Sequence, residues 1–342
     1  MDYKRIALYF AVALVAVLLY IKWEHDYPPA AVNQTEQTLS QNQSGKNTQD
    51  FGPTAYSPTL DADKTKQSAS IFSSQTVDET SNQQIQIKTD VLLASINTLG
   101  GNLVVTQLPA YPVSLEEKNT PVTLFTPEIP YVAESGLTTL KGALKPIPYR
   151  TTQFRYVLPD GHQELKVILN GEQNGIRITK TYLFYRGSYA IKELIHITNT
   201  TSMIWKGSLY GQLVRKNVPI EQSMHSRSYI GGAMYTEDEP YKQLKYEDLS
   251  EINVSQDVKG GWVAFQQPYF LTAWIPQKEP TYHYYSHSQG DGKEGENNLF
   301  TLGFVSQQMS IAPHQTVMQS TTIYAGPEIA SNLEKLDRKS VV

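Results

Sequence analysis

The chain of 342 residues carries 29 Lys and Arg against 33 Asp and Glu, and its net charge of −4 lacks the basic excess of a nucleic-acid-binding protein. It contains no cysteine, which excludes disulfides, thiolate metal sites, a cysteine nucleophile and a lipoprotein anchor. Its 22 Tyr, 21 Gly and 19 Pro are typical of a turn-rich β protein.

The chain opens with an uncharged apolar run, IALYFAVALVAVLLYI, at residues 6–21. As a helix this run covers about 24 Å, and flanking interfacial residues extend it towards the roughly 30 Å hydrocarbon core of a bilayer. No A-x-A pattern follows it, which favours an uncleaved transmembrane anchor at residues 1–27 over a cleaved signal peptide. Lys4 and Arg5 outweigh Lys22, so we expect the N-terminus inside and the bulk of the chain exported.

A polar segment follows at residues 28–84. Only eight of the 55 positions from 30 to 84 are Val, Ile, Leu, Met, Phe, Trp or Tyr. So little apolar surface does not offset the entropy lost on folding. The composition therefore predicts a disordered tether whose ends are separated by about 40 Å.

From residue 85 to 326 the pattern changes to short apolar runs punctuated by Gly, Pro and Asn. In the run 176–185, Ile176 and Ile178 share one face with Tyr182 and Phe184, as in a half-buried strand. So many strands predict a large antiparallel sandwich of two extended sheets, and no fixed repeat favours a propeller or solenoid. We expect strands at 85–96, 101–108, 152–158, 165–169, 176–185, 189–198, 207–214, 260–266, 269–275, 281–286, 298–306 and 316–324.

The last segment, residues 327–342, is predicted to begin with a short helix. Pro327 stands at a favoured first-turn position, and Ile329, Leu333 and Leu336 recur with helical spacing.

A search for chemistry yields no catalytic, cofactor-binding or metal-ligating residue. His283 and His287 have a metal-like spacing, but on a strand they lie about 13 Å apart. Gly100-Gly101 and Gly260-Gly261 are not followed by a helix with a Lys-Ser/Thr pair, so bends or close backbone packing explain them better than phosphate loops. The acidic run at 237–239 is interpreted as an exposed turn.

The most apolar part of the exported region is GGWVAFQQPYFLTAWIP at residues 260–276. Its aromatic residues, from Trp262 to Trp274, favour a pair of central strands. A ligand groove or a partner surface is the alternative, because Trp and Tyr are also favoured at interfaces.

Several stretches, taken in order, are recognisable together. They are the opening anchor with Trp23-Glu24, TDVLLASINTLGGNLVVTQLPAYP (89–112), YIGGAMYTEDEPYKQLKYEDL (229–249), VKGGWVAFQQPYFLTAWIP (258–276) and TTIYAGPEI (321–329). In this combination the chain resembles the N-terminal part of a bacterial YidC-type membrane protein insertase. The resemblance covers nearly the whole chain, although none of the motifs is catalytic.

The resemblance implies an inner-membrane anchor and a periplasmic β-supersandwich domain, similar to sugar mutarotases and followed by a short helix. It implies a role, without enzymatic activity or cofactor, in inserting and folding inner-membrane proteins, alone or with the Sec translocon. The implied partners are the inner membrane, nascent membrane proteins and Sec accessory subunits, the last contacting residues around 205–250. The helix at 327–336 would couple the domain to an insertase core.

The sequence departs from the family in one respect, because nothing after Ile21 approaches 18 consecutive apolar residues. We therefore expect a fragment without the insertase helices, which acts as a tethered interaction domain. Two alternatives remain open at this stage. One is a membrane-tethered carbohydrate-binding or mutarotase-like protein, because fold does not fix function. The other is a passive spacer.

Overall fold

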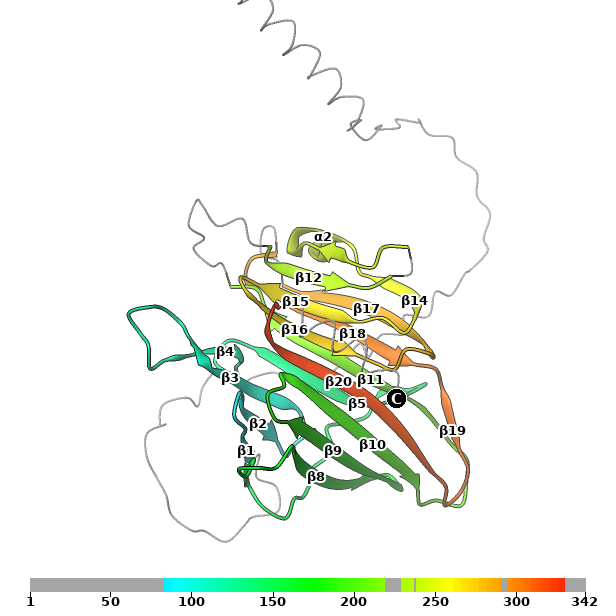
Figure 1. Cartoon of the computed structure of the whole chain (residues 1–342). Helices are drawn as coiled ribbons and strands as arrows, with labels where there is room; N and C mark the ends of the chain where they lie inside the picture. Colours follow the sequence, from blue (N-terminus) through cyan, green and yellow to red (C-terminus); the bar gives the residue numbers. More distant parts are fainter. Residues whose placement is uncertain (1–82, 219–228, 237, 291–294, 330–342) are drawn as a thin grey trace, which may run out of the picture. The chain divides into compact units, whose positions relative to one another are not determined.

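The computed structural model describes residues 83–218, 229–236, 238–290 and 295–329 (Figure 1). The expected anchor at 1–27 and nearly all of the expected tether at 28–84 lie outside these ranges. No helix within them is long and apolar enough to cross a membrane. The elements are β1 (Gln84–Lys88), β2 (Leu93–Asn97), β3 (Leu103–Pro112), β4 (Pro121–Phe125), β5 (Tyr131–Thr139), β6 (Gly142–Ala143), β7 (Arg155–Val157), β8 (Glu164–Gln173), β9 (Ile176–Tyr185), β10 (Ala190–Asn199), β11 (Trp205–Lys216), β12 (Gly231–Met234), β13 (Lys242–Leu244), α2 (Tyr246–Glu251), β14 (Ser255–Lys259), β15 (Val263–Gln267), β16 (Phe270–Ile275), β17 (Thr281–Gln289), β18 (Leu299–Ser306), β19 (Met309–Ile311) and β20 (Thr316–Pro327).

The strands form two sheets. The 12-stranded sheet has the order β14-β17-β18-β11-β5-β3-β2-β1-β7, and β19, β4 and β6 pair with β11, β3 and β5. The 8-stranded sheet has the order β13-β12-β15-β16-β20-β10-β9-β8. The pairing is antiparallel except between β1 and β7, which run parallel. The predicted mainly β fold with two large sheets is therefore confirmed.

Alternation of side chains along the strands explains which residues enter the core between the sheets. In β9 and β10, Ile178 and Ile191 point inward with Phe184, which lies opposite Ile191 across the strand pair. Arg177, which directly precedes Ile178 in β9, points to solvent. This period of two is the pattern that the sequence showed.

One tryptophan joins the two sheets directly. Trp274 of β16 is fully buried and donates a hydrogen bond from Nε1 to the backbone oxygen of Gln212 in β11, at 2.8 Å. Its ring packs edge-on against Phe304 of β18, with ring centroids 6.1 Å apart. The hydrogen bond satisfies the indole N–H, which would otherwise be costly to bury.

Most of the expected strands are present, and the differences have local causes. The single strand expected at 85–96 is a hairpin instead, because Thr89 turns the chain by accepting hydrogen bonds from the N–H groups of Val91 and Leu92. Eight further elements were not expected from the sequence, and most of them are very short or contain glycine. These are β4, β5, β6, β12, β13, β14, β19 and α2.

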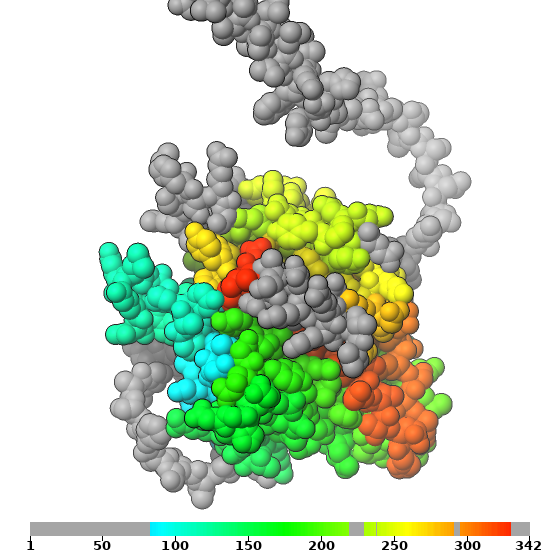
Figure 2. Space-filling model, in the orientation of Figure 1, coloured from blue at the N-terminus to red at the C-terminus, as the bar shows by residue number. Residues whose placement is uncertain are grey.

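The β3–β4 hairpin projects from the body at the left of the view (Figure 1, Figure 2). Tyr111 anchors its base through an edge-on contact with Phe270, with ring centroids 5.6 Å apart. Further along the hairpin, Leu115 is 86% exposed.

The C-terminal helix expected from residue 327 does not begin there. Pro327 is the last residue of β20, where it pairs with Phe270 of β16. Residues 330–342 lie outside the described part of the chain, so the remainder of that prediction is untested.

Buried tyrosines give the fold a pH dependence. Burial raises the pKa of Tyr246 to about 12, and it raises the pKa of Tyr284 and Tyr285 well above the usual value of 10.0. In the unfolded chain these phenols ionise near pH 10, so between pH 10 and 12 the folded state holds more protons. The free energy of unfolding should therefore fall with rising pH in this range, by about 1.4 kcal/mol per pH unit for each buried phenol.

Urea unfolding of the chain in detergent at several pH values, followed by tryptophan fluorescence, measures this slope. Tyr246→Phe is the matched control, because the Tyr246 hydroxyl has no hydrogen-bond partner among the described residues. This variant should reduce the fall in the free energy of unfolding by about 1.4 kcal/mol per pH unit, which is the contribution of one proton. A free energy of unfolding that stays constant from pH 10 to 12 would contradict the prediction.

Candidate functional site

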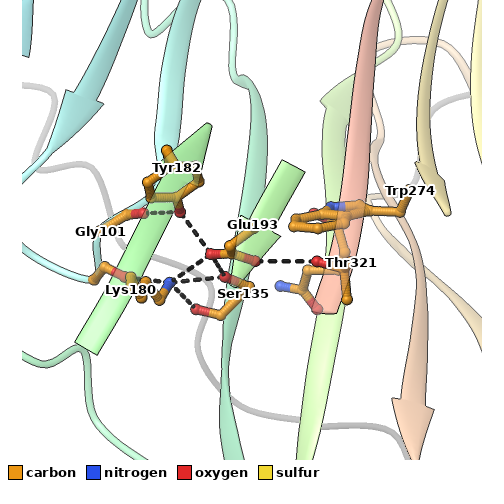
Figure 3. Close-up of polar contacts among 9 residues, drawn as sticks. Gly101, Ser135, Lys180, Tyr182, Glu193, Trp274 and Thr321 are labelled. Carbon is orange, nitrogen blue, oxygen red and sulfur yellow. Dashed lines mark hydrogen bonds and ion pairs between the residues drawn. The ribbon is translucent and has the colours of Figure 1, made fainter. Parts of the chain in front are cut away.

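The inner faces of β9 and β10 each carry one charged residue in an otherwise apolar row. Lys180 lies between Ile178 and Tyr182, and Glu193 lies between Ile191 and Ile195. The side chains of Lys180 and Glu193 are 1% and 0% exposed, and Nζ lies 3.5 Å from Oε1 (Figure 3). A buried ion pair is stable only when further hydrogen bonds satisfy both groups.

Glu193 receives hydrogen bonds from three hydroxyl groups on three other strands. Ser135 Oγ donates to Oε1 at 2.7 Å, and Thr321 Oγ1 donates to Oε2 at 3.2 Å. The Tyr182 hydroxyl lies 2.7 Å from Oε1 and 2.5 Å from the Gly101 backbone oxygen, so its single proton is shared between two acceptors. The carboxylate thus ties β5, β9 and β20 to β10.

Lys180 uses its ammonium group to cross from one sheet to the other. Nζ donates to the backbone oxygens of Gly100 and Ser135 at 2.9 Å and to Ser135 Oγ at 2.7 Å. Gly100 and Gly101 form the β2–β3 turn with φ of 85° and 65°, a region that favours glycine. A Cβ on Gly101 would lie only 3.1 Å from Lys180 Cδ, so this glycine pair serves close packing, as the sequence predicted.

The electrostatics of the pair follow from its isolation from water. Burial lowers the pKa of Lys180, and the Glu193 carboxylate opposes that effect. Burial and the nearby Glu193 charge both raise the pKa of Tyr182 well above 10.0. Because these groups are enclosed by both sheets and hydrogen-bonded to one another, the pair fastens the sandwich and offers no atom to a ligand.

A second polar row lies on the other face of the 12-stranded sheet. Gln212 of β11 donates to Glu134 Oε2 of β5 at 2.8 Å and accepts a hydrogen bond from the Tyr285 hydroxyl of β17 at 2.6 Å. Burial raises the pKa of Glu134, with Gln212 opposing the shift. Tyr210 lies in the same row, and burial and the Glu134 charge raise its pKa above the usual range. A carboxyl group with a raised pKa beside phenols suits proton transfer or recognition of a hydroxylated ligand.

The histidines that the sequence singled out lie on β17, which is a strand as predicted. His283 Nδ1 is 2.8 Å from Asp257 Oδ1 of β14, and His287 is exposed further along the strand. Within the described ranges no three His, Cys, Asp or Glu side chains gather closely enough to hold a metal ion. Gly260 and Gly261, with φ of 61° and 82°, turn the chain between β14 and β15.

The aromatic segment around Trp262 and Trp274 forms β15 and β16 in the middle of the 8-stranded sheet. Trp274 and Phe265 are fully buried, which confirms the interpretation as central strands. Tyr269, in the turn between these strands, is 76% exposed and has a left-handed φ of 68°.

The region around 205–250, expected to contact Sec accessory subunits, is not one surface element. Its β11 runs through the 12-stranded sheet, whereas β12 and β13 end the 8-stranded sheet. Residues 219–228 and 237 lie outside the described part. Asp238 and Glu239 are exposed in a turn closed by a hydrogen bond from the Thr236 N–H to the Glu239 oxygen, which agrees with the predicted acidic turn.

Lys180, Glu193 and Glu134 were not singled out from the sequence. The signal for the first two was present, because the alternation that placed Ile178 and Ile191 inward places Lys180 and Glu193 on the same faces. A charged residue at an inward position requires a partner, and the strand pattern alone does not name it.

These features define a large two-sheet β domain in which the buried charged pair Lys180–Glu193 joins the two sheets. Comparison with known proteins identifies its family. The model of the YidC periplasmic domain matches residues 84–340, and the chain belongs to this family.

Curated relatives match along almost the whole chain. The protein named membrane protein insertase YidC from Coxiella burnetii (strain Dugway 5J108-111) is 42% identical over 341 residues, which are 98% of this chain and 59% of the relative. The protein of the same name from Nitrosococcus oceani is 34% identical over 97% of this chain and 59% of its own length. The chain therefore spans about three fifths of the length of these relatives.

Similar solved structures include a galactose mutarotase related enzyme from Lactobacillus acidophilus, with a TM-score of 0.47 and 9% identity over 72% of this chain and 99% of that one. A galactose mutarotase-like protein from Lactobacillus casei gives a TM-score of 0.46 and 10% identity over 71% of this chain and 100% of that one.

The buried pair predicts a double-mutant result. Glu193→Gln and Lys180→Met should each lower the free energy of unfolding by about 3–5 kcal/mol, because each leaves an unpaired buried charge. The double variant should lose less than the sum of the two. Urea unfolding of all four chains measures the coupling.

The exposed pair Arg177–Glu172, with N and O atoms 3.1 Å apart and side chains 59% and 51% exposed, is the matched control. Glu172→Gln should cost less than about 1 kcal/mol. Additive effects of Glu193→Gln and Lys180→Met would show that the two groups do not act as a unit.

Proposed function

We propose that this chain is the anchor and periplasmic region of an insertase that assists the insertion and folding of bacterial inner-membrane proteins. The observation that carries the proposal is the match to relatives named membrane protein insertase over 98% of the chain. In this proposal residues 1–27 span the inner membrane once and the β domain lies in the periplasm.

Within such a protein, the β domain acts as a tethered interaction module. Its charged core groups are enclosed, so it has surfaces to offer rather than a reaction centre. We assign the insertion of polar segments into the bilayer to the part of the relatives that this chain does not match, because moving such segments requires intramembrane polar groups. The proposed partners are nascent membrane proteins and Sec accessory subunits, the latter at residues 205–250.

Site-specific photocrosslinking in bacterial membranes tests the partner surface. A photoreactive phenylalanine analogue at Tyr241, whose side chain is 43% exposed, should yield adducts with Sec accessory subunits or substrate loops. The same analogue at Phe154, which is 40% exposed and lies outside 205–250, is the matched control. Equal adducts at both positions would contradict the assignment, and no adducts at either would favour a passive spacer.

Reconstitution tests whether the insertion activity lies outside this chain. Proteoliposomes that contain this chain alone should fail to insert a substrate membrane protein, whereas a full-length relative should insert it. Efficient insertion by this chain alone would refute the proposal that the insertion machinery lies elsewhere.

A second candidate function rests on the polar row of Glu134, Gln212 and Tyr285. A half-buried carboxyl with a raised pKa, joined to an amide and a phenol, is a group that recognises hydroxylated ligands. Titration with hexoses discriminates, because saturable millimolar or tighter binding that Glu134→Gln abolishes would favour a carbohydrate-binding role. The absence of binding by the unaltered chain would leave the insertase role as the only one of the two supported.

A further inference from the structure

One end of the sandwich carries an unusual group of exposed apolar side chains. Leu140, in the turn between β5 and β6, is 83% exposed. Met203 and Ile204, which immediately precede β11, are 75% and 61% exposed. The two turns lie at the same end, because β5 and β11 are antiparallel neighbours and Thr138 pairs with Ser208. β19 and the adjacent ends of β10 and β20 reach this end at the lower right of Figure 1.

Hydrogen bonds within the turns hold these side chains outward. Asn199 is fully buried, and its Nδ2 donates to the backbone oxygens of Met203 at 2.6 Å and Ile311 at 2.9 Å. In the other turn, the Lys141 N–H donates to Thr139 Oγ1 at 3.2 Å. The apolar side chains are therefore presented by fixed backbone, so little ordering entropy opposes a contact there.

The charge at this end has one sign. Lys141 and Lys206 are exposed beside the apolar residues, and neither forms an ion pair within the described ranges. No Asp or Glu occurs in residues 138–149, 198–211 or 306–316, the segments that build this end. The acid in the adjoining β8–β9 hairpin, Glu172, is paired with Arg177 at 3.1 Å.

Trp205 completes the surface. It is half-buried at the start of β11, and its ring lies over Gly207 beside the Thr138 backbone oxygen. Indole rings favour the boundary between headgroups and acyl chains, where one edge remains hydrated. Aliphatic tips, an interfacial tryptophan and unpaired lysines together match an anionic lipid surface.

The β3–β4 hairpin provides a contrast on the same domain. Leu115 is 86% exposed there, but Glu116 and Glu117 follow it directly. An anionic bilayer would repel that tip. Apolar exposure is thus common to both places, but the hairpin tip carries two acids against Lys118, whereas Lys141 and Lys206 stand beside Leu140 and Met203 without acidic neighbours.

We propose that Leu140, Met203, Ile204, Trp205, Lys141 and Lys206 form a contact surface for an anionic lipid bilayer, which we term the basic apolar end. Each lysine close to an anionic leaflet strengthens association about fivefold. Two such residues give only weak binding alone, but a tether to the same membrane raises the local concentration enough for repeated contact. The contact would orient the β domain on the membrane. This inference rests on the proposed membrane location.

The chain contains no cysteine, so a single introduced thiol reports one position. The experiment uses the full chain with Met203→Cys carrying an environment-sensitive fluorophore, in vesicles of phosphatidylcholine with or without phosphatidylglycerol. Doxyl-labelled lipids should quench the label at least threefold more strongly with phosphatidylglycerol, and Lys141→Glu with Lys206→Glu should remove the difference. Leu115→Cys, equally labelled, is the control and should show no such dependence.

Vesicle flotation separates failure of this inference from failure of the proposed location. Flotation with pure phosphatidylcholine reports the anchor, so its absence contradicts the location. If the protein does not float with pure phosphatidylcholine, the lipid contact is still supported when the protein floats with vesicles that contain phosphatidylglycerol and the Lys141→Glu, Lys206→Glu variant does not. No flotation with either vesicle overturns both proposals.

Other outcomes overturn the lipid assignment alone. They are floated protein without quenching at position 203, equal quenching at position 115, or quenching that does not depend on phosphatidylglycerol. Crosslinking between two Met203→Cys chains without lipid would assign the surface to a second copy. A signal that appears only after a partner protein is added would assign it to that protein.

Discussion

The pairing of Lys180 with Glu193 is the interaction on which the sandwich depends most directly. An ammonium and a carboxylate that lie 1% and 0% exposed are tolerable only if every strand around them is correctly placed. Lys180 reaches the β2–β3 turn and β5, whereas Glu193 collects hydroxyl groups from β5, β9 and β20. A shift of β9 or β10 by one residue would turn Lys180 or Glu193 to solvent and leave the other charge unpaired in the core. The pair therefore constrains the register of β5, β9, β10 and β20 around it.

Close approach of backbone and side chains is the second constraint. Gly101 has a left-handed φ and leaves room for Lys180 and the Tyr149 ring, and its oxygen accepts from Tyr182. Trp274 binds the Gln212 backbone across the core. These contacts join β9 and β16 of the 8-stranded sheet to the β2–β3 turn and β11 of the 12-stranded sheet. The side chains between the two sheets therefore serve packing and hydrogen bonding within the domain.

The domain has two distinct kinds of polar site. Glu193 is fully satisfied and enclosed, whereas Glu134 lies on the other face of β5 with an amide and a phenol in line. Adjacent positions on one strand, Glu134 and Ser135, thus belong to hydrogen-bond networks on opposite faces of the 12-stranded sheet. The family match covers residues 84–340 and therefore includes the strands of both sheets.

The sequence by itself determined the mainly β class, the alternation of β9 and β10, and the membership of Trp274 in a central strand. It did so because burial follows a period of two that is written locally. It did not reveal β4 or β12, whose short or glycine-rich runs carry too little pattern, nor β5, whose inward positions include the polar Ser135. Only the tertiary structure decided that Lys180 meets Glu193, that Glu134 meets Gln212, and that Leu140 and Met203 share an end. These contacts join residues that lie up to about eighty positions apart in the sequence. Which of them come together depends on the order of the strands in the sheets, and local composition does not determine that order.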